Sequence, residues 1–305
     1  MNSEKLIGAV LASFVFIHCG GSNPGAVNPY GIGSKPAISA ASLCPGAKSE
    51  NSDGYGGGDG TIGNPYLICT NEQFKSIQGD MKTKRFFRLT SDLDFALEGN
   101  IRIINIAPFA SIDGDNHKIK NITIEHGHGF KDNGLFGQLT KDLNGNRDEV
   151  KNLIVENVKI TGDGAEDGAG VIAAANWDGI ISNVHITGVV TVDYPPDVSP
   201  NTWSAGGIVG TNSYLIENSS FDGQVSGVYN VGGIAGINDG IIRNSTASGT
   251  VQGRHGVGGL VGVQFKPGVV ENNTALSRVS GVGHFGDLIG FICSERYYSS
   301  CGISR

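Results

Sequence analysis

The chain has 305 residues, of which 48 are glycine and only 17% are charged, and its formal net charge is −7. This charge argues against nucleic acid as a partner, because phosphate binding needs a basic surface and the 29 acidic residues outnumber the 22 basic ones. Ile, Val, Asn, Ser and Thr are abundant, a composition typical of strands joined by tight turns. The glycines do not follow the three-residue period of collagen, which excludes a collagen triple helix. The strand-and-turn composition therefore predicts an all-β fold.

The first 18 residues have the features of an export signal. Lys5 precedes the apolar run Leu6–Ile17, which is too short for a permanent membrane span but suits a signal peptide. Cys19 follows almost directly, with small residues behind it, and this arrangement resembles a lipobox, although the three residues before the cysteine depart from the usual pattern. We expect a lipoprotein-type signal peptide at 1–18 and a lipidated Cys19 that holds the protein in the cell envelope, at the outer membrane or cell surface. A simple secretion signal is the alternative.

Four further cysteines, an even number, favour disulfides in an exported chain. They allow three connectivities, and we favour Cys44–Cys69 with Cys293–Cys301, because each pair brackets one end of the repeats described below. Free cysteines are the alternative. No CxxC spacing or histidine cluster indicates a metal site, and no motif calls for a cofactor.

Residues 19–60 are rich in Gly, Ser, Pro and Ala and predict a flexible tether. In residues 61–131, Thr70 followed by Gln73 has the spacing of a capping box and predicts the start of a short helix, with strand-like pieces around it. We expect 61–131 to form an N-terminal cap and 293–305 a C-terminal cap, because the ends of a repeat array must be covered.

Residues 132–292 contain an internal repeat. The segments AGGIVGTNSYLIENSSFDGQVSG, VGGIAGINDGIIRNSTASGTVQG and VGGLVGVQFKPGVVENNTALSRVSG are copies of one another, and Gly207, Gly233 and Gly259 lie 26 residues apart. A period of this length indicates a solenoid, a propeller or an array.

Three columns of equivalent residues predict which architecture it is. The first column is apolar: Val150, Ile181, Ile216, Ile242 and Val270. Two residues further on, every copy has asparagine: Asn152, Asn183, Asn218, Asn244 and Asn272. Three residues beyond it a second apolar column follows: Val155, Ile186, Phe221, Ala247 and Ala275. An odd spacing cannot put both apolar columns on the inner face of one straight strand, so the chain must turn a corner near the asparagine.

These columns predict a parallel β-helix, or β-solenoid, of about five to six coils. The asparagines would then stack, and their amides could hydrogen-bond along the stack. Alternatively they adopt the left-handed turn conformation that asparagine tolerates, and both can hold at once. An insertion at 193–203 contains prolines and interrupts one coil, so we expect a projecting loop with Tyr194 and Trp203 as binding candidates. The alternative is that Trp203 covers the core of a coil.

Copies of the form VGGLVGxNxGxIxNSxAxGxV resemble the GLUG repeat of bacterial surface proteins, which occurs in immunoglobulin A proteases and adhesins. The upstream segments GNPYLICTNEQF and DGDNHKIKNITI resemble the region that precedes those repeats. The resemblance covers roughly residues 60 to 292. It implies an extracytoplasmic β-solenoid, and it does not imply protease activity, since the repeats of that family are not its catalytic domain.

No catalytic motif is recognisable: HExxH is absent, and Gly127-His128-Gly129 matches only a short piece of the galacturonase pattern. The acidic segments 53–59 and 113–116 fit Asx turns better than calcium loops. We therefore expect a non-enzymatic, membrane-anchored surface lipoprotein whose β-helix binds an extracellular protein or glycan. The alternatives are a polysaccharide-acting β-helix enzyme, either a lyase or a hydrolase, and a purely structural envelope protein.

Overall fold

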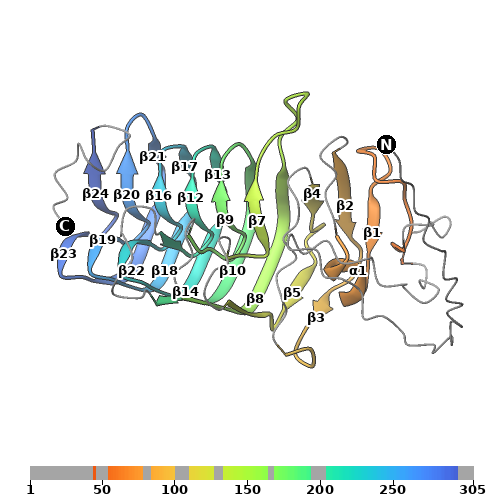
Figure 1. Cartoon of the computed structure of the whole chain (residues 1–305), viewed down its shortest axis with the longest axis horizontal. Helices are drawn as coiled ribbons and strands as arrows, with labels where there is room; N and C mark the ends of the chain where they lie inside the picture. Colours follow the sequence, from red (N-terminus) through yellow and green to blue (C-terminus); the bar gives the residue numbers. More distant parts are fainter. Residues whose placement is uncertain are drawn as a thin grey trace, which may run out of the picture. The chain divides into compact units, whose positions relative to one another are not determined.

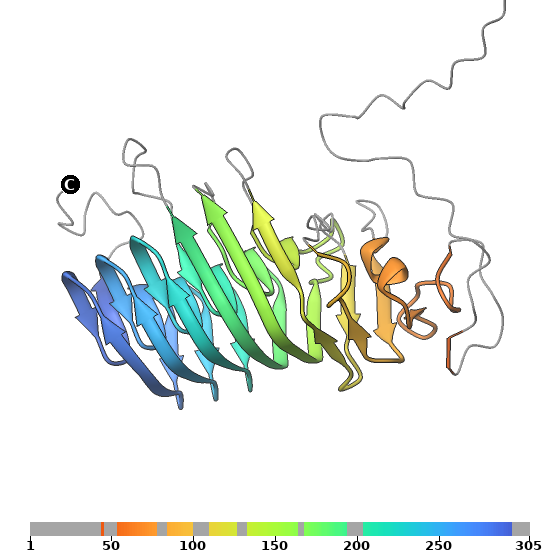
Figure 2. The same ribbon diagram turned by 90° about the horizontal axis from the view of Figure 1, so that it is seen from below.

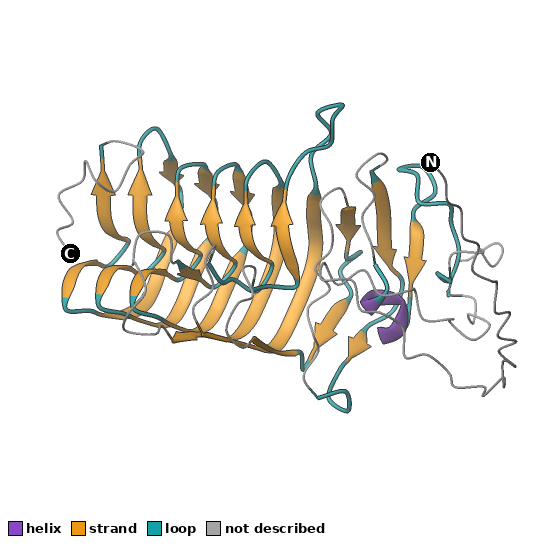
Figure 3. Cartoon of the chain, viewed as in Figure 1, coloured by secondary structure: helices purple, strands orange, loops and turns teal. Residues whose placement is uncertain are grey.

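The computed structural model describes residues 44–45, 54–77, 84–99, 110–126, 133–163, 168–193 and 204–294. They all belong to one compact unit that spans residues 37–305. Strands dominate, and the only helix among the described residues is the single turn and a half of α1 (Asn71–Lys75), drawn in purple in Figure 3. The strands form three sheets, and the pairings within each sheet are parallel. The prediction of a mostly β, parallel solenoid is confirmed at this level.

The largest sheet has 14 strands in two rows. The first row is β1 (Tyr66–Ile68), β2 (Arg85–Leu89), β4 (Ala110–Asp113), β8 (Glu149–Asp163), β10 (Ile180–Asp193), β13 (Leu215–Glu217), β17 (Ile241–Arg243) and β21 (Val269–Glu271). The second row contains β3 (Leu93–Asp94), β5 (Lys118–Lys120), β6 (Thr123–His126), β14 (Ser220–Ser226), β18 (Thr246–Gln252) and β22 (Thr274–Ser280). β8 and β10 are long enough to belong to both rows.

Two smaller sheets complete the solenoid. One contains β7 (Phe136–Leu139), β9 (Ala173–Asn176), β12 (Val209–Asn212), β16 (Ala235–Asn238), β20 (Val261–Phe265) and β24 (Ile289–Cys293). The other contains β11 (Ala205–Gly206), β15 (Tyr229–Gly232), β19 (His255–Gly258) and β23 (Gly283–Gly286). The chain passes from the six-stranded sheet to the large sheet, then to the four-stranded sheet and back, so that successive copies stack in chain order (Figures 1 and 2).

The pairing register matches the columns of the repeat. In the first apolar column, Ile181 pairs with Val150 on one side and with Ile216 on the other. In the second, Phe221 pairs with Ile186 and with Ala247. All six side chains are at most 2% exposed, so both columns face the core. The corner between them lies at the asparagine, whose φ is between 51° and 54° in all five copies.

The glycine pairs allow the coils to approach closely at the turn into the six-stranded sheet. A Cβ placed on Gly207 would lie 2.2 Å from the carbonyl oxygen of Gly233 in the next coil. No side chain fits into that space, because non-bonded heavy atoms prefer separations of about 3.5–4.0 Å. The repeat of glycine at this position therefore follows from the stacking distance.

The region expected to be the N-terminal cap also contributes strands to the parallel stack. β1, β2 and β4 extend the first row of the large sheet, and Ile112 of β4 pairs with Val150 of β8. Ordered packing also starts inside the segment expected to be a tether, because Tyr55 is 1% exposed and its ring lies 4.7 Å from that of Tyr66. The parallel stack thus begins well before residue 132, where the clear repeats begin.

Candidate binding surface

Four of the predicted site residues lie outside the described part of the chain. They are Cys19, the expected lipidation site; Tyr194 and Trp203, the expected binding-loop residues; and Cys301. Their roles remain predictions. In the part that the structure describes, no helix is long and apolar enough to cross a membrane.

The structure joins Cys44 to Cys69 in a disulfide, with 5.5 Å between the two Cα atoms. This bond ties the chain before β1 to the start of α1. There, Thr70 and Gln73 form the predicted capping box, and the Gln73 side chain also accepts a hydrogen bond of 2.7 Å from the backbone N–H of Cys69. Cys293 is buried and disulfide-bonded, but its pairing with Cys301 remains a prediction.

Asn152 and Asn183 of the predicted asparagine column have both expected features, the left-handed backbone conformation and side-chain hydrogen bonds between coils. Asn183 Nδ2 donates to Asn152 Oδ1 at 2.9 Å, and Asn152 Nδ2 donates to Asp113 Oδ1 at 3.0 Å. Further along the stack, the residue after the asparagine bridges the coils: Ser245 Oγ accepts from the N–H of Ser219 at 3.2 Å. The left-handed corner is thus common to all copies, and the side-chain bonds vary.

A second column of amides, which the sequence reasoning missed, lies inside the molecule. Asn176 donates to Asn212, Asn212 donates to Asn238, and Asn238 donates to Gln264, over 2.8, 2.7 and 2.8 Å. The three asparagines are 0% exposed and Gln264 is 5% exposed. An amide residue recurs five positions after Gly207, Gly233 and Gly259, and this was the available signal. The buried ladder fixes the corner that follows it, because each amide bonds to the coil beside it.

One exposed tryptophan lies at that corner. Trp177 follows Asn176 directly, is 43% exposed, and donates from Nε1 to Gln138 Oε1 at 3.1 Å. The ring is therefore held in one orientation while much of its surface faces solvent. In the register of the neighbouring coil, the equivalent position is Ser213.

Charged side chains converge on Asp178, the residue that follows Trp177. Asp178 accepts from Lys141 Nζ at 3.0 Å and from Arg147 Nη1 at 2.8 Å, and Arg147 Nη1 also donates to the Asp178 carbonyl oxygen at 2.9 Å. The Arg147 guanidinium lies 3.7 Å from the centroid of the Tyr214 ring, a cation–π contact. Together with Gln138 and Trp177, these four residues are called the corner cluster below.

The charges in the corner cluster change the pKa of the Asp178 carboxyl group. Partial burial alone would raise the pKa of its carboxyl group, but the hydrogen bonds and positive charges of Lys141 and Arg147 outweigh that effect and lower the pKa. The carboxylate is therefore ionised at neutral pH and holds both cations in place.

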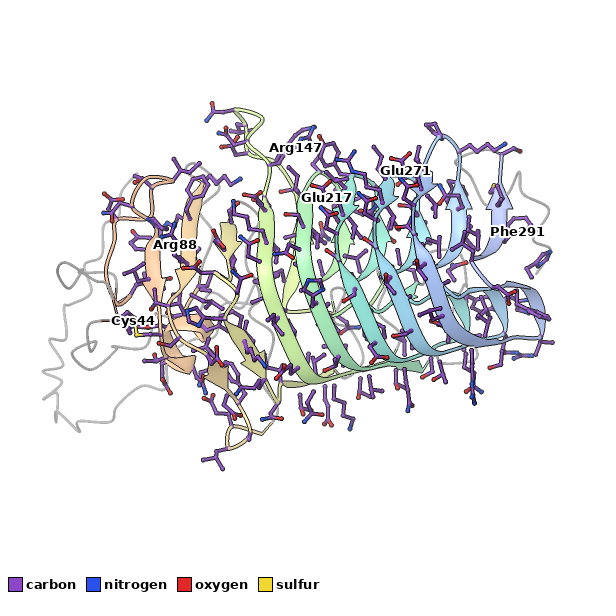
Figure 4. The ribbon with its side chains drawn as sticks, turned by 180° about the vertical axis from the view of Figure 1, so that it is seen from behind. Cys44, Arg88, Arg147, Glu217, Glu271 and Phe291 are labelled. Atoms are coloured by element: carbon purple, nitrogen blue, oxygen red, sulfur yellow. A yellow bond between two sulfur atoms is a disulfide. The ribbon has the colours of Figure 1, made fainter. Side chains whose placement is uncertain are left out.

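The loop between β7 and β8 projects beyond the neighbouring turns (Figure 1), and it contains Lys141 and Arg147 of the corner cluster. Asp142 braces this loop, because its Oδ1 accepts the backbone N–H groups of Asn144 and Asn146 at 2.9 and 2.8 Å. Leu143 is 94% exposed, and Arg147 lies near the foot of the loop, as Figure 4 shows. The loop begins directly after Leu139, whose carbonyl oxygen accepts the backbone N–H of Trp177 at 2.9 Å.

Other candidate sites are less developed. A shallow hollow of about 90 Å³ lies over β2, β4 and β8, lined by residues such as Phe86, Arg88 and Lys151. Within the described ranges, no group of three or more His, Cys, Asp and Glu side chains could hold a metal ion. Asp113 Oδ1 accepts the N–H of Asp115 at 3.0 Å and Asp59 Oδ1 accepts that of Thr61 at 3.0 Å, so both segments form Asx turns.

Comparisons with known proteins agree with this architecture. Two segments match the GLUG motif. They are residues 201–226 and 227–252, which contain β11 to β14 and β15 to β18. Halomucin of Haloquadratum walsbyi is 31% identical over 181 residues, which cover 53% of this chain and only 2% of halomucin.

A solved structure has the same fold. It is the crystal structure of a candidate immunoglobulin A1 protease from Bacteroides ovatus, with a TM-score of 0.59 and 24% sequence identity. The match covers 76% of each chain. At this identity the likeness shows the fold alone.

Proposed function

We propose that this protein is a non-enzymatic, membrane-anchored bacterial surface lipoprotein whose β-solenoid binds an extracellular protein or glycan and so mediates adhesion. The corner cluster carries the proposal. Trp, Tyr and Arg are the residue types most enriched among the residues that dominate binding energy, and here they lie together on the surface of a rigid scaffold.

The internal order of the scaffold supports this role. The buried amide ladder Asn176–Asn212–Asn238–Gln264 ends directly beside Trp177 and fixes its backbone. A binding residue whose position is fixed before binding loses little conformational entropy when the ligand arrives. The lipobox-like Cys19 and the Gly- and Ser-rich segment after it would hold such a scaffold away from a membrane.

The anchor is tested by metabolic labelling with a clickable fatty acid in a Gram-negative expression host. Wild type should incorporate the label, and a Cys19→Ala variant should not. Equal labelling of both would contradict the lipid anchor. Protease shaving of intact cells then shows whether the solenoid faces the outside, which the adhesion role requires.

Binding is tested with the unlipidated Cys19→Ala chain, comparing attachment to target cells before and after a further Trp177→Ala change. We expect the affinity of attachment to fall about thirtyfold or more, since truncation of a dominant binding residue costs about 2 kcal/mol or more. Leu97→Ala is the matched control, because Leu97 is 100% exposed on the turn after β3, away from the corner cluster. Unchanged attachment of the Trp177→Ala variant would contradict the role of the corner cluster, and a deletion of 193–203 then tests the expected loop.

A polysaccharide-acting enzyme, the alternative from another class, would use free carboxylates along one face. Three outward carboxylates of the large sheet are instead paired: Glu149 with Lys151, Glu156 with Lys118 and Glu217 with Arg243, at 2.8, 2.7 and 2.6 Å. We expect the purified chain to leave acidic and neutral polysaccharides, and immunoglobulin A1, intact. Cleavage of any of them would contradict the non-enzymatic proposal.

A further inference from the structure

We propose that the corner cluster is a glycan site that takes an uncharged pyranose ring stacked on the indole of Trp177. This inference deepens the proposed binding function and rests on it, since it names the chemistry of the ligand. Three observations carry it: the exposed and oriented indole, the mixed donors and acceptors around it, and the balance of charge.

The indole is built as a platform. Its only polar hydrogen, on Nε1, is already used by Gln138, so what remains for a ligand is the apolar ring face. An aromatic face is electron-rich and attracts the weakly positive C–H groups that line one side of a pyranose ring. A ring that is 43% exposed and cannot rotate freely presents this face without a deep pocket.

The rim of the platform offers donors and acceptors together. Arg147 and Lys141 each donate to Asp178, and each has further N–H groups, since a guanidinium carries five and an ammonium carries three. Asp178 contributes acceptor oxygens. A sugar hydroxyl both donates and accepts, so a ligand rich in hydroxyl groups can use both kinds of partner.

The charges of this region cancel. Lys141 and Arg147 are balanced by Asp178 and by Asp142 of the neighbouring loop, and Asp178 already bridges both cations. The negative charge of the buried Asp148 is balanced by Lys84, which interacts with it, and Glu149 is paired with Lys151, so the start of β8 adds no net charge. A carboxylated or sulfated sugar would have to break the bridge to Asp178 or face two carboxylates, and a neutral sugar avoids both.

The fluorescence of Trp177 reports on the site directly. The chain has two tryptophans, so a Trp203→Phe change in the unlipidated Cys19→Ala chain leaves Trp177 as the single emitter. This protein is titrated with a neutral β-glucan, a galactan and a mannan, and with polygalacturonate as the charged comparison. We expect a saturable change with at least one neutral polymer, at least about fivefold weaker binding of polygalacturonate, and less than a twofold change in affinity as NaCl is raised well above physiological strength.

Variants at Trp177 and Leu97 distinguish a loss of sugar stacking from a loss of folded structure. Affinity electrophoresis in the same polysaccharide should show loss of retardation for Trp177→Ala, partial retention for Trp177→Phe and no change for Leu97→Ala. All three should keep the melting temperature of the parent chain, because both positions are exposed. No response to any neutral polymer, or stronger binding to polygalacturonate, would overturn the glycan assignment.

The source of the sugar is resolved with target cells and with a glycoprotein before and after enzymatic deglycosylation. Loss of Trp177-dependent attachment after deglycosylation supports the inference. Attachment that depends on Trp177 but survives deglycosylation points to a protein partner, which overturns the glycan assignment and leaves the proposed binding function intact. Attachment that is insensitive to Trp177→Ala, with no response in the polysaccharide titrations, contradicts both.

Discussion

Asparagine has two separate roles here, and burial of the side chain distinguishes them. At the corners of the large sheet, Asn218 and Asn244 are exposed and serve through their left-handed backbone. Inside the six-stranded sheet, Asn212 and Asn238 are 0% exposed and serve through their amides. A buried amide must have its hydrogen-bonding groups satisfied, so the second role is the more costly one to disturb.

Asn238 is an inner member of the buried ladder and is hydrogen-bonded to a neighbour on each side. Its replacement by alanine removes an acceptor from Asn212 and a donor from Gln264, both in the interior. We expect Asn238→Ala to lower the free energy of unfolding by about 2–4 kcal/mol, because each stranded buried polar group costs about 1–3 kcal/mol. Urea denaturation followed by circular dichroism measures it.

Asn218→Gly is the control for that measurement. Glycine adopts a φ of 51° without strain, and the side chain that is lost is exposed. The expected change is within about 1 kcal/mol. A larger effect at Asn218 than at Asn238 would contradict the distinction between the two roles.

Asp178 links the corner cluster to pH. Because its pKa is lowered in the folded protein, its contribution to stability is present above the unfolded pKa of about 3.9 and is lost as the pH falls through the folded value. We expect Asp178→Asn to lower the free energy of unfolding at pH 7 by at most about 1 kcal/mol, since the pair partners are solvent-screened. Urea titrations at neutral and acidic pH test this, and a difference that grows as the pH falls would show the sign to be wrong.

At the scale of elements, the solenoid depends on close approach between the backbones of neighbouring coils as much as on its apolar columns. In the second row of the large sheet, Gly188, Gly223 and Gly249 occupy the same register on β10, β14 and β18. A Cβ on Gly249 would lie 1.9 Å from the Gly223 carbonyl oxygen, and the φ of Gly249 is 101°. On these three strands only glycine fits at this register, because the backbone of the paired strand in the neighbouring coil occupies the space that a Cβ would need.

Gly249→Ala should therefore be strongly destabilising, by about 2–4 kcal/mol, because the obstructing atom is backbone and cannot rotate away. Thermal melting monitored by circular dichroism gives the comparison with wild type. Gly63→Ala is the matched control, since no atom lies within 4 Å of the added Cβ, and its melting temperature should stay close to that of wild type. Equal melting temperatures for all three proteins would refute the close approach.

At the scale of the whole molecule, the core is continuous from Tyr55 to Val261 and thins out beyond it. Ile242, Ala247 and Val251 are at most 1% exposed, whereas their partners in the next copy, Val270, Ala275 and Val279, are partly exposed. In a stacked array each unit is stabilised by its neighbours, so units with less burial open first.

Hydrogen exchange should follow this gradient. We expect backbone amides of β22 to exchange at least about tenfold faster than those of β14 in the 305-residue chain, measured by mass spectrometry of peptic fragments. β18 should be intermediate, which supplies an internal reference. Uniform protection across β14, β18 and β22 would mean that the array opens only as a single unit.

Much of the fold could be predicted from the sequence because stacking copies one local pattern. Val150 and Val155 are five residues apart with Asn152 between them, and every copy repeats this spacing of two apolar residues around an asparagine. This spacing was enough to place the corner and the inner faces. The two buried columns are local consequences of side-chain direction along a strand. The end of the tether was not predictable in this way, because Tyr55 stands in a Gly-rich segment and its burial depends on contacts with distant residues such as Tyr66, Phe87 and Ser76.

The candidate binding site shows more clearly what could not be predicted from the sequence. Sequence reasoning pointed to Tyr194 and Trp203, whose placement the structure does not describe, and passed over Trp177, because nothing local separates an exposed tryptophan from a buried one. Gln138, Arg147, Trp177 and Tyr214 come from three successive copies, and Arg147 contacts Asp178 across 31 residues of chain. The sequence alone determined the parallel stack, its period and its corners, since these repeat locally. Only the tertiary structure decided which polar residues form the buried ladder and which side chains meet at the corner, because both depend on neighbours that the stack supplies.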